Sequence, residues 1–361
     1  MEDLGLNKSF WSGRRVLLTG HTGFKGSWLL LLLESLGAKV TGLALDAEPG
    51  GLFEQIGGAS RCAHNIADIR DYASVEAVVA EARPEVIFHL AAQALVRQSY
   101  RDPLETFSTN VLGTANLLQA TRKVDGLRAI ISVTTDKCYA NDGRKTGYRE
   151  TDRLGGHDPY SSSKACAELA TQSFRDSFFA ERAIGVATAR AGNVIGGGDY
   201  SADRLVPDAV QALEAGRRVE LRNPAAVRPW QHVLEPLTGY CLLAERLAAD
   251  PGRFAKAWNF GPPPADVASV ASVVGQFARH WGQSGQFQPQ SGDHPHEAAV
   301  LTLDSSMAMR ELGWRPRLSL VTAVGWTAEW YRARQSGGDA AGLCLDQIRR
   351  YFASDLVQAA A

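Results

Sequence analysis

Short apolar runs alternate with longer segments through the first half of the chain. Runs of strand length lie at 15–19, 39–45, 86–91, 129–134 and 183–189, and segments of helix length lie at 28–36 and 72–82. Apolar strands that alternate with helices are typical of a parallel sheet, because each crossover helix covers one of its faces. The pattern predicts a doubly wound α/β fold.

The pattern changes after residue 195, where loops rich in Gly, Asp, Pro and Arg follow. This change predicts a second, smaller α/β lobe. Residues 256–261 again have the pattern of a strand that ends in glycine, so we expect the chain to return to the main sheet. The expected main domain comprises 1–195 and 232–265, and the interleaved smaller lobe comprises 196–231 and 266–361.

Composition and charge exclude several classes of protein. The 361 residues carry a formal net charge of -1, which gives no basic field for nucleic acid. The longest apolar run, 28–33, is far shorter than the roughly 20 residues that cross a bilayer. The first 15 residues lack the order of a signal peptide. We therefore expect a cytoplasmic protein that binds neither nucleic acid nor membranes.

Cysteine and histidine spacing predicts neither a disulfide framework nor a metal site. The five cysteines are scattered and form no CxxC pair. His294 and His296 flank Pro295 and could in principle bind a metal ion. Two histidines of this kind are typical of a polar loop.

Three glycines, Gly20, Gly23 and Gly26, lie between the first expected strand and the first expected helix. At this place the backbone can turn sharply and approach a pyrophosphate at the helix N-terminus, so the loop predicts a bound dinucleotide. Asp46 lies about 20 positions further on, where a carboxylate reaches ribose hydroxyls and favours NAD over NADP. A solvated role for Asp46 stays open, and Lys25 is a nearby cation that could instead accept a phosphate.

Residues at the ends of later strands could complete the dinucleotide site. Asp68 and Ile69 follow the expected third strand, where they would meet the adenine edge. Residues 88–93 place small side chains at the end of another strand, where a ring could lie close to the backbone.

Two motifs could carry chemistry. Tyr160 and Lys164 are four residues apart, a spacing that brings both to one face of a helix. A cation beside a phenol lowers its pKa from about 10, so we expect Tyr160 to act as a base near neutral pH. Thr135, Asp136 and Lys137 follow another strand, at the edge of the sheet where open α/β folds hold their ligands.

Six segments together resemble the extended short-chain dehydrogenase/reductase family, a family of Rossmann fold, and within it the CDP-D-glucose 4,6-dehydratases. They are 19–28 (TGHTGFKGSW), 89–97 (HLAAQALVR), 135–139 (TDKCY), 154–168 (LGGHDPYSSSKACAE), 190–199 (RAGNVIGGGD) and 228–233 (RPWQHV). The resemblance covers nearly the whole chain. It implies an NAD-dependent conversion of CDP-glucose to a 4-keto-6-deoxy sugar nucleotide and water.

The resemblance also implies roles for individual residues. Tyr160, assisted by Thr135 and Lys164, would take the O4 proton during hydride transfer to NAD. Lys137 would take the C5 proton, where dTDP-glucose relatives carry Glu, and Asp136 would protonate the leaving C6 hydroxyl. The expected cofactor contacts come from Gly20, Thr22, Gly23, Phe24, Lys25, Gly26, Asp46, Asp68, Ile69, Leu90, Ala91, Ala92, Gln93, Asn110, Tyr160 and Lys164. The expected substrate contacts come from Gln93, Asn193, Arg204, Leu205, Pro207 and Arg228.

Other functions share parts of this pattern. A dTDP-glucose 4,6-dehydratase, or a nucleotide-sugar epimerase or decarboxylase, would share the glycine loop and the Tyr/Lys pair. A dinucleotide-sensing protein without activity would be expected to lack Tyr160 or Lys164. The helices after Asn110 and Tyr160 carry apolar positions suited to a subunit contact, and the family leads us to expect a homodimer or a dimer of dimers.

Overall fold

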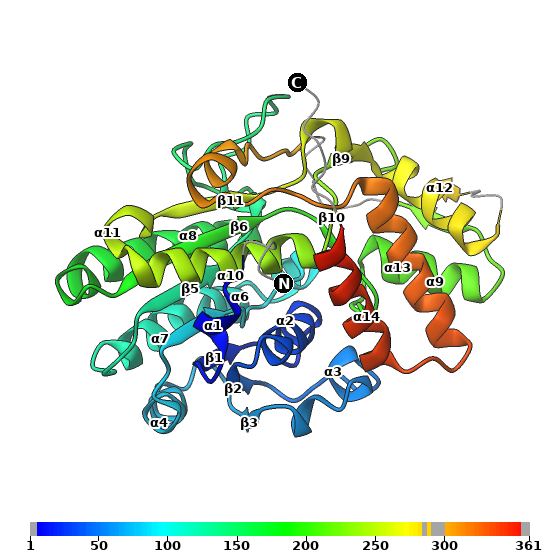
Figure 1. Ribbon diagram of the computed structural model, residues 1–361. Coiled ribbons are helices and arrows are strands. Elements are labelled where there is room, and N and C mark those ends of the chain that lie inside the picture. The colour runs from blue at the N-terminus through cyan, green and yellow to red at the C-terminus, as the bar shows by residue number, and fades with distance from the viewer. Residues whose placement is uncertain (1–5, 284–286, 290–299, 355–361) are drawn as a thin grey trace.

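The centre of the protein is a parallel sheet of seven strands, seen in a computed structural model that describes residues 6–283, 287–289 and 300–354 (Figure 1). The strand order is β11-β6-β5-β4-β1-β2-β3, and every neighbouring pair is parallel. The strands are β1 Arg15–Thr19, β2 Lys39–Ala44, β3 Ala63–Ile66, β4 Val86–His89, β5 Ala129–Val133, β6 Gly185–Ala191 and β11 Ala257–Phe260. The predicted doubly wound α/β fold is confirmed.

Helices cover both faces of this sheet. Leu17, Ile87 and Ile130 belong to a buried cluster that includes side chains of α4 (Tyr72–Ala82) and α7 (Gly113–Thr121). Their neighbours Leu18 and Phe88 belong to a second cluster, shared with α2 (Phe24–Ser35) and α10 (Leu234–Ala249). Because successive strand residues point to opposite faces, each strand contributes to both cores.

Two of the predicted elements begin more than one residue away from the predicted start, and several of the predicted strands end one or two residues away from the predicted end. Helix α2 begins at Phe24 rather than at residue 28, because Gly23 is its N-cap and the first turn is already helical. Strand β6 begins at Gly185 rather than at residue 183, because Ala183 has a positive φ of 53° that ends the preceding turn. Helix α4 spans the predicted residues.

The remaining elements form the smaller lobe and the connections. Three strand pairs lie outside the main sheet: β7 Val194–Ile195 with β10 Gln231–His232, β8 Val219–Leu221 with β13 Phe287–Pro289, and β9 Val227–Arg228 with β12 Ala268–Ser269. The other helices are α1 Lys8–Trp11, α3 Leu52–Gln55, α5 Val96–Arg101, α6 Pro103–Phe107, α8 Pro159–Phe174, α9 Leu205–Glu214, α11 Pro251–Phe254, α12 Val270–Trp281, α13 Leu320–Gln335 and α14 Ala340–Ala353. Between these lobe elements, β11 pairs with β6 in the main sheet. The predicted domain boundaries stay a prediction.

One buried carboxylate joins α10 to the last two helices. Glu235, in the first turn of α10, accepts hydrogen bonds from the backbone N–H groups of Arg317 (2.9 Å) and Leu318 (2.7 Å). Its other oxygen accepts a hydrogen bond from the Tyr351 hydroxyl on α14 at 2.9 Å. Burial raises the pKa of Glu235 to about 7, against these hydrogen bonds.

Among the described residues, no helix is long and apolar enough to span a membrane. All five cysteines are free thiols.

Candidate active site

The glycine turn between β1 and α2 packs so closely on neighbouring backbone that two of its glycines have no space for a side chain. Gly20 has a φ of 72°, and a Cβ there would lie 2.7 Å from the backbone nitrogen of Ala91. A Cβ on Gly26 would lie 2.1 Å from the Gly20 carbonyl oxygen. Gly26 lies in the first turn of α2, not in the connecting loop that the sequence suggested. Gly23 caps α2 without a side-chain hydrogen bond, so the first N–H groups of the helix can meet an anion.

A cavity of about 1580 Å³ extends from this turn across the carboxyl ends of the central strands. It lies where β1 has β2 on one side and β4 on the other, which is the switch point at which doubly wound folds bind ligands. Its volume exceeds the 300–1,000 Å³ that is typical for one small ligand. The cavity can therefore hold a dinucleotide together with a second substrate.

Most of the predicted cofactor residues line this cavity. They are Gly20, Thr22, Gly23, Phe24, Lys25, Gly26, Asp68, Ile69, Leu90, Ala91, Ala92, Tyr160 and Lys164. The Asp68 carboxylate is held by the Arg70 guanidinium, which also lines the cavity. Asp46 is exposed and follows the lining residue Leu45, but it is not itself part of the lining.

Asn110 and Gln93 are engaged with the protein instead of the cavity. The Asn110 amide accepts a hydrogen bond from the Gln93 backbone N–H (2.9 Å) and donates to Ser163 Oγ on α8 (2.8 Å). The Gln93 amide donates to Thr106 Oγ1 and accepts from the Leu95 N–H. Neither residue lines the cavity, so these side chains brace the loop after β4 rather than contact a ligand.

Tyr160 and Lys164 lie on α8, whose N-cap is Asp158. Both side chains are buried and line the cavity. The Lys164 ammonium donates to the Val133 carbonyl at 3.2 Å. Burial lowers the pKa of Lys164 to about 8, and the charge of Glu168 opposes this effect.

The pKa of Tyr160 differs from the sequence expectation. Burial raises the pKa of Tyr160 to about 12, while a hydrogen bond with Thr135 and the charge of Arg204 lower it. The sequence predicted that Lys164 lowers the pKa of Tyr160. This prediction was wrong for the protein alone, because desolvation of the buried phenolate outweighs the charges around it. Further positive charge is needed at this site before Tyr160 can act as a base.

The Thr-Asp-Lys turn, residues 135–138, follows β5. Thr135 Oγ1 donates to Asp136 Oδ1 at 3.0 Å and accepts a hydrogen bond from the Lys137 N–H at 3.3 Å. Asp136 is fully buried, and Lys137 Nζ lies 3.6 Å from its Oδ1. The other oxygen, Asp136 Oδ2, has no hydrogen-bond partner among the described residues. Thr135 and Lys137 line the cavity on the same side as Tyr160.

Lys25 lies within reach of the charges of Lys164, Asp136 and Lys137. Sequence reasoning missed this position. Burial lowers the pKa of Lys25 to about 7, the charges of Arg204, Lys164 and Lys137 lower it further, and Asp136 opposes them. The side chain therefore does not lie where a ribose phosphate would bind. The early start of α2 hid this position, because residues 24–26 were interpreted as a loop.

The predicted substrate residues, apart from Gln93, line the same cavity, and the charge of Arg204 reaches Tyr160. Arg204 caps α9 and lies 3.4 Å from Asp199, and Leu205 and Pro207 form the first turn of that helix. Arg228 is buried on β9, and its guanidinium donates to the Val227 carbonyl at 2.9 Å. Asn193 Oδ1 is buried with no hydrogen-bond partner among the described residues, which suits a ligand donor.

The described part of the chain contains no group of three or more His, Cys, Asp or Glu side chains that could hold a metal ion. His294 and His296 lie outside the described residues.

Comparisons with known sequences identify similar proteins over nearly the whole chain. A family model described as GDP-mannose 4,6 dehydratase matches residues 17–325. The chain is 46% identical over 355 residues to a CDP-glucose 4,6-dehydratase of Salmonella typhimurium, covering 97% of this chain and 99% of that protein. It is 25% identical over 346 residues to a dTDP-glucose 4,6-dehydratase of Xanthomonas campestris pv. campestris, covering 89% and 93%.

Solved structures of nucleotide-sugar enzymes share the fold. The UDP-glucose 4-epimerase of Thermotoga maritima superposes with a TM-score of 0.77 at 23% identity, covering 89% of this chain and 99% of that one. DesIV, a dTDP-glucose 4,6-dehydratase of Streptomyces venezuelae solved with NAD bound, gives 0.77 at 24% identity, covering 91% and 99%. Likeness at these identities concerns the fold alone.

Proposed function

Because the chain belongs to the GDP-mannose 4,6-dehydratase family, we propose that it converts CDP-D-glucose to CDP-4-keto-6-deoxy-D-glucose and water with NAD as cofactor. The observation that carries this proposal is that Thr135, Lys137, Tyr160 and Lys164 line one cavity, with Asp136 buried between Thr135 and Lys137 in the turn. The Salmonella typhimurium relative with the same activity is 46% identical over nearly its full length, which supports CDP-D-glucose as the substrate.

The glycine turn fits a dinucleotide. Gly20 and Gly26 let the turn pack tightly on its own backbone and on Ala91, and the residues of the turn line the cavity at the N-terminus of α2. When bound there, NAD supplies the hydride acceptor for sugar C4 and the hydride donor for C6. Leu90, Ala91 and Ala92 provide a wall of small side chains and backbone against which a ring can lie.

Tyr160 removes the proton from the O4 hydroxyl while C4 is oxidised. Thr135, whose hydroxyl lowers the pKa of Tyr160, shares the hydrogen bond to O4. Lys164, one helical turn from Tyr160 on α8, would favour the phenolate through its ammonium charge. Oxidation at C4 makes the C5 proton acidic.

Asp136 and Lys137 then carry out the elimination. Lys137 Nζ and Asp136 Oδ1 are 3.6 Å apart, so we assign the amine of Lys137 as the base and the acid form of Asp136 as the proton donor for one sugar. The amine accepts the C5 proton, and the acid gives its proton to the C6 hydroxyl, which leaves as water. We place the acidic proton on Asp136 Oδ2, the oxygen without a partner. Lys137 returns a proton to C5 when C6 is reduced.

The Arg204 and Arg228 end of the cavity binds the cytidine diphosphate. A guanidinium offers a planar set of donors that matches phosphate oxygens, and Asn193 lines the same cavity. The first turn of α9, with Leu205 and Pro207, lies against the base.

The decisive experiment is to incubate the purified protein separately with CDP-glucose and dTDP-glucose, and to measure product mass and the alkali-induced absorbance of a 4-keto sugar. Loss of one water from CDP-glucose is the expected result. Loss of water from dTDP-glucose alone would show that dTDP-glucose is the substrate instead of CDP-glucose. An unchanged mass with altered sugar stereochemistry would indicate an epimerase.

The proposal includes a homodimer, or a dimer of dimers. Leu104 on α6, Leu112 in the π-helical turn at 108–112 and Leu169 on α8 are 81%, 60% and 55% exposed, and these elements pack together. Such an apolar face favours contact with a second copy. Leu112→Glu with Leu169→Glu is expected to halve the mass in sedimentation. Val321→Glu, also at an exposed apolar residue, is expected to leave it unchanged.

A further inference from the structure

A buried ion pair lies behind the candidate site. Glu168, one helical turn after Lys164 on α8, accepts two hydrogen bonds from Arg190 on β6, from Nε at 2.9 Å and from Nη2 at 2.8 Å. The two side chains are 3% and 4% exposed. A buried pair gains little net stability over apolar residues, because both charges lose their hydration. Its presence beside a reactive site calls for another explanation.

The pair holds the Thr-Asp-Lys turn from both sides. Thr134, which precedes the turn, donates its hydroxyl hydrogen bond to Glu168. Tyr139, which follows the turn, accepts a hydrogen bond on its hydroxyl from Arg190 Nη1 at 2.8 Å. Residues 135–138 are thus attached at each end to one rigid pair.

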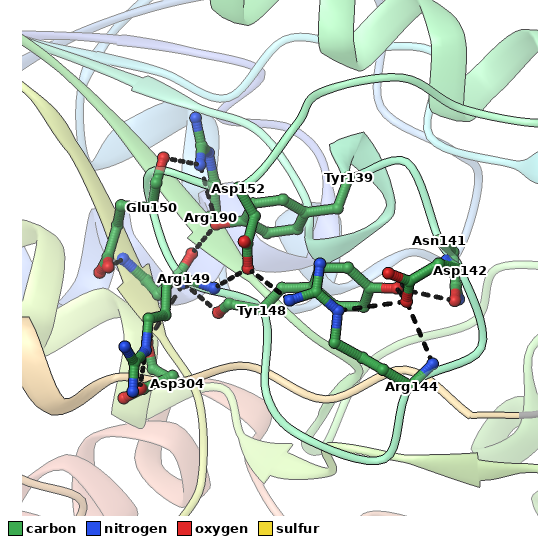
Figure 2. A network of polar contacts seen from close by, with 11 residues as sticks. Tyr139, Asn141, Asp142, Arg144, Tyr148, Arg149, Glu150, Asp152, Arg190 and Asp304 are labelled. Atoms are coloured by element: carbon green, nitrogen blue, oxygen red, sulfur yellow. Dashed lines mark hydrogen bonds and ion pairs between the residues drawn. The ribbon is translucent and has the colours of Figure 1, made fainter.

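The anchor at Tyr139 is itself fixed. Its hydroxyl donates to Asn259 Oδ1 on β11 at 2.7 Å, and its ring stacks on Tyr148 at 5.1 Å between centroids. Figure 2 shows Arg190 directed at the Tyr139 hydroxyl, and a network of polar contacts that continues through Arg149 to Asp304. Movement of Tyr139 would break several of these contacts together.

The same pair reaches the second motif of the site through α8. Glu168 and Lys164 lie four residues apart on one face of the helix, and the Glu168 charge raises the pKa of Lys164 against burial. Glu168 and Arg190 do not line the cavity, and their charged groups are hydrogen-bonded to each other and to Thr134, Tyr139 and Thr188. Their effect on the reaction must act through other residues.

We propose that the Glu168–Arg190 pair is the positioning device of this site, which holds the Thr-Asp-Lys turn against helix α8 so that elimination and oxidation act on one bound sugar. This inference rests on the proposed dehydratase function. Glu168 and Arg190 are therefore positioning residues rather than catalytic ones.

Two threonines give a matched test. Thr134 and Thr188 are both buried, and both donate a hydroxyl hydrogen bond to Glu168, Thr188 at 2.6 Å. Only Thr134 adjoins the turn, where it also lines the cavity, whereas Thr188 lies within β6, so the exchange measurement without substrate separates positioning from contact with a ligand. A merely structural role for the Glu168 carboxylate predicts equal losses for Thr134→Val and Thr188→Val. Positioning predicts a loss of activity for Thr134→Val alone.

The expected kinetic result for Thr134→Val is a fall in kcat of about tenfold or more, with KM for CDP-glucose changed less than about threefold, because displaced reacting groups lower the rate rather than binding. Thr188→Val is expected to stay within about threefold of wild type in both constants, and Thr134→Ser, which keeps the hydroxyl, to regain most of the rate. Equal kcat losses for the two valine variants would overturn the inference.

Amide hydrogen exchange provides a readout that needs no substrate. The peptide that contains residues 134–139 is expected to exchange faster in Thr134→Val and in Tyr139→Phe than in wild type, and as slowly as wild type in Thr188→Val. Unchanged exchange in both of the first variants would refute the positioning role. If wild type fails to dehydrate CDP-glucose, the proposed function fails, while the exchange result still decides whether the pair holds the turn.

Discussion

Replacement of Glu235 by Gln is expected to stabilise the protein at alkaline pH. The Gln carbonyl oxygen can accept the same two backbone N–H groups of Arg317 and Leu318. Its amide can donate to the Tyr351 hydroxyl, which can then donate to Thr238 Oγ1 at 3.1 Å. The variant therefore keeps every hydrogen bond of Glu235 and removes only the buried charge.

The magnitude follows from the raised pKa of Glu235, from an ordinary 4.5 to about 7 in the folded protein. A raised carboxyl pKa means that folding favours the protonated form. The contribution of Glu235 to the free energy of unfolding is therefore fully present below pH 4.5 and is lost as pH rises through 7. Ionisation of Glu235 then lowers the free energy of unfolding by about 1 kcal/mol at pH 5 and by about 3 kcal/mol at pH 8. The variant should avoid both costs.

The assay is urea unfolding of wild type and Glu235→Gln at pH 5 and at pH 8. Other titrating groups cancel in the difference between the two proteins, and the advantage of the variant should grow by about 2 kcal/mol between the two pH values. A difference that does not change with pH would refute the reasoning, as would a variant that is less stable than wild type at pH 8.

Three changes test the site itself. Gly26→Ala places a Cβ 2.1 Å from the Gly20 oxygen and should weaken NAD binding about tenfold or more in a fluorescence titration. The control is Gly275→Ala, inside helix α12, where a Cβ lies 3.7 Å from the nearest side-chain atom. This variant should bind NAD as wild type does. Lys137→Glu should lower kcat for dehydration about 100-fold or more, because the C5 base is replaced; full activity would show that lysine is not required. Arg228→Ala should raise KM for the nucleotide sugar about tenfold in initial-rate measurements, through loss of a charged hydrogen bond to the diphosphate; an unchanged KM would remove Arg228 from the substrate site.

The central fold was predictable because buried parallel strands have a simple signature. Strand β5 is buried at all five positions, so its sequence is a continuous apolar run with one serine. The glycine turn was predictable for a similar reason, since Gly20 needs a positive φ and lies against the backbone of Ala91. Both signals are local in the sequence.

Other features depend on distant parts of the chain and leave no local pattern. Asn110 is a predicted cofactor ligand, and its hydrogen bonds with Gln93 and Ser163 could not be foreseen from the sequence. The pKa of Tyr160 could not be derived from its spacing to Lys164, because burial dominates it. The Glu168–Arg190 pair joins a helix to a strand 22 residues later, and nothing in either segment alone predicts it.

The contact between Tyr139 and Asn259 spans 120 residues and has a consequence for protein synthesis. A growing polypeptide can assemble strands β1 to β6 from its first 191 residues, and with them the glycine turn. The Tyr139 hydroxyl acquires its Asn259 partner only when β11 has left the ribosome, because domains fold from the N-terminus during translation. Nascent chains should therefore be able to bind a dinucleotide before they can fix the reacting turn. The order of translation makes catalytic competence the last property that the newly made enzyme gains.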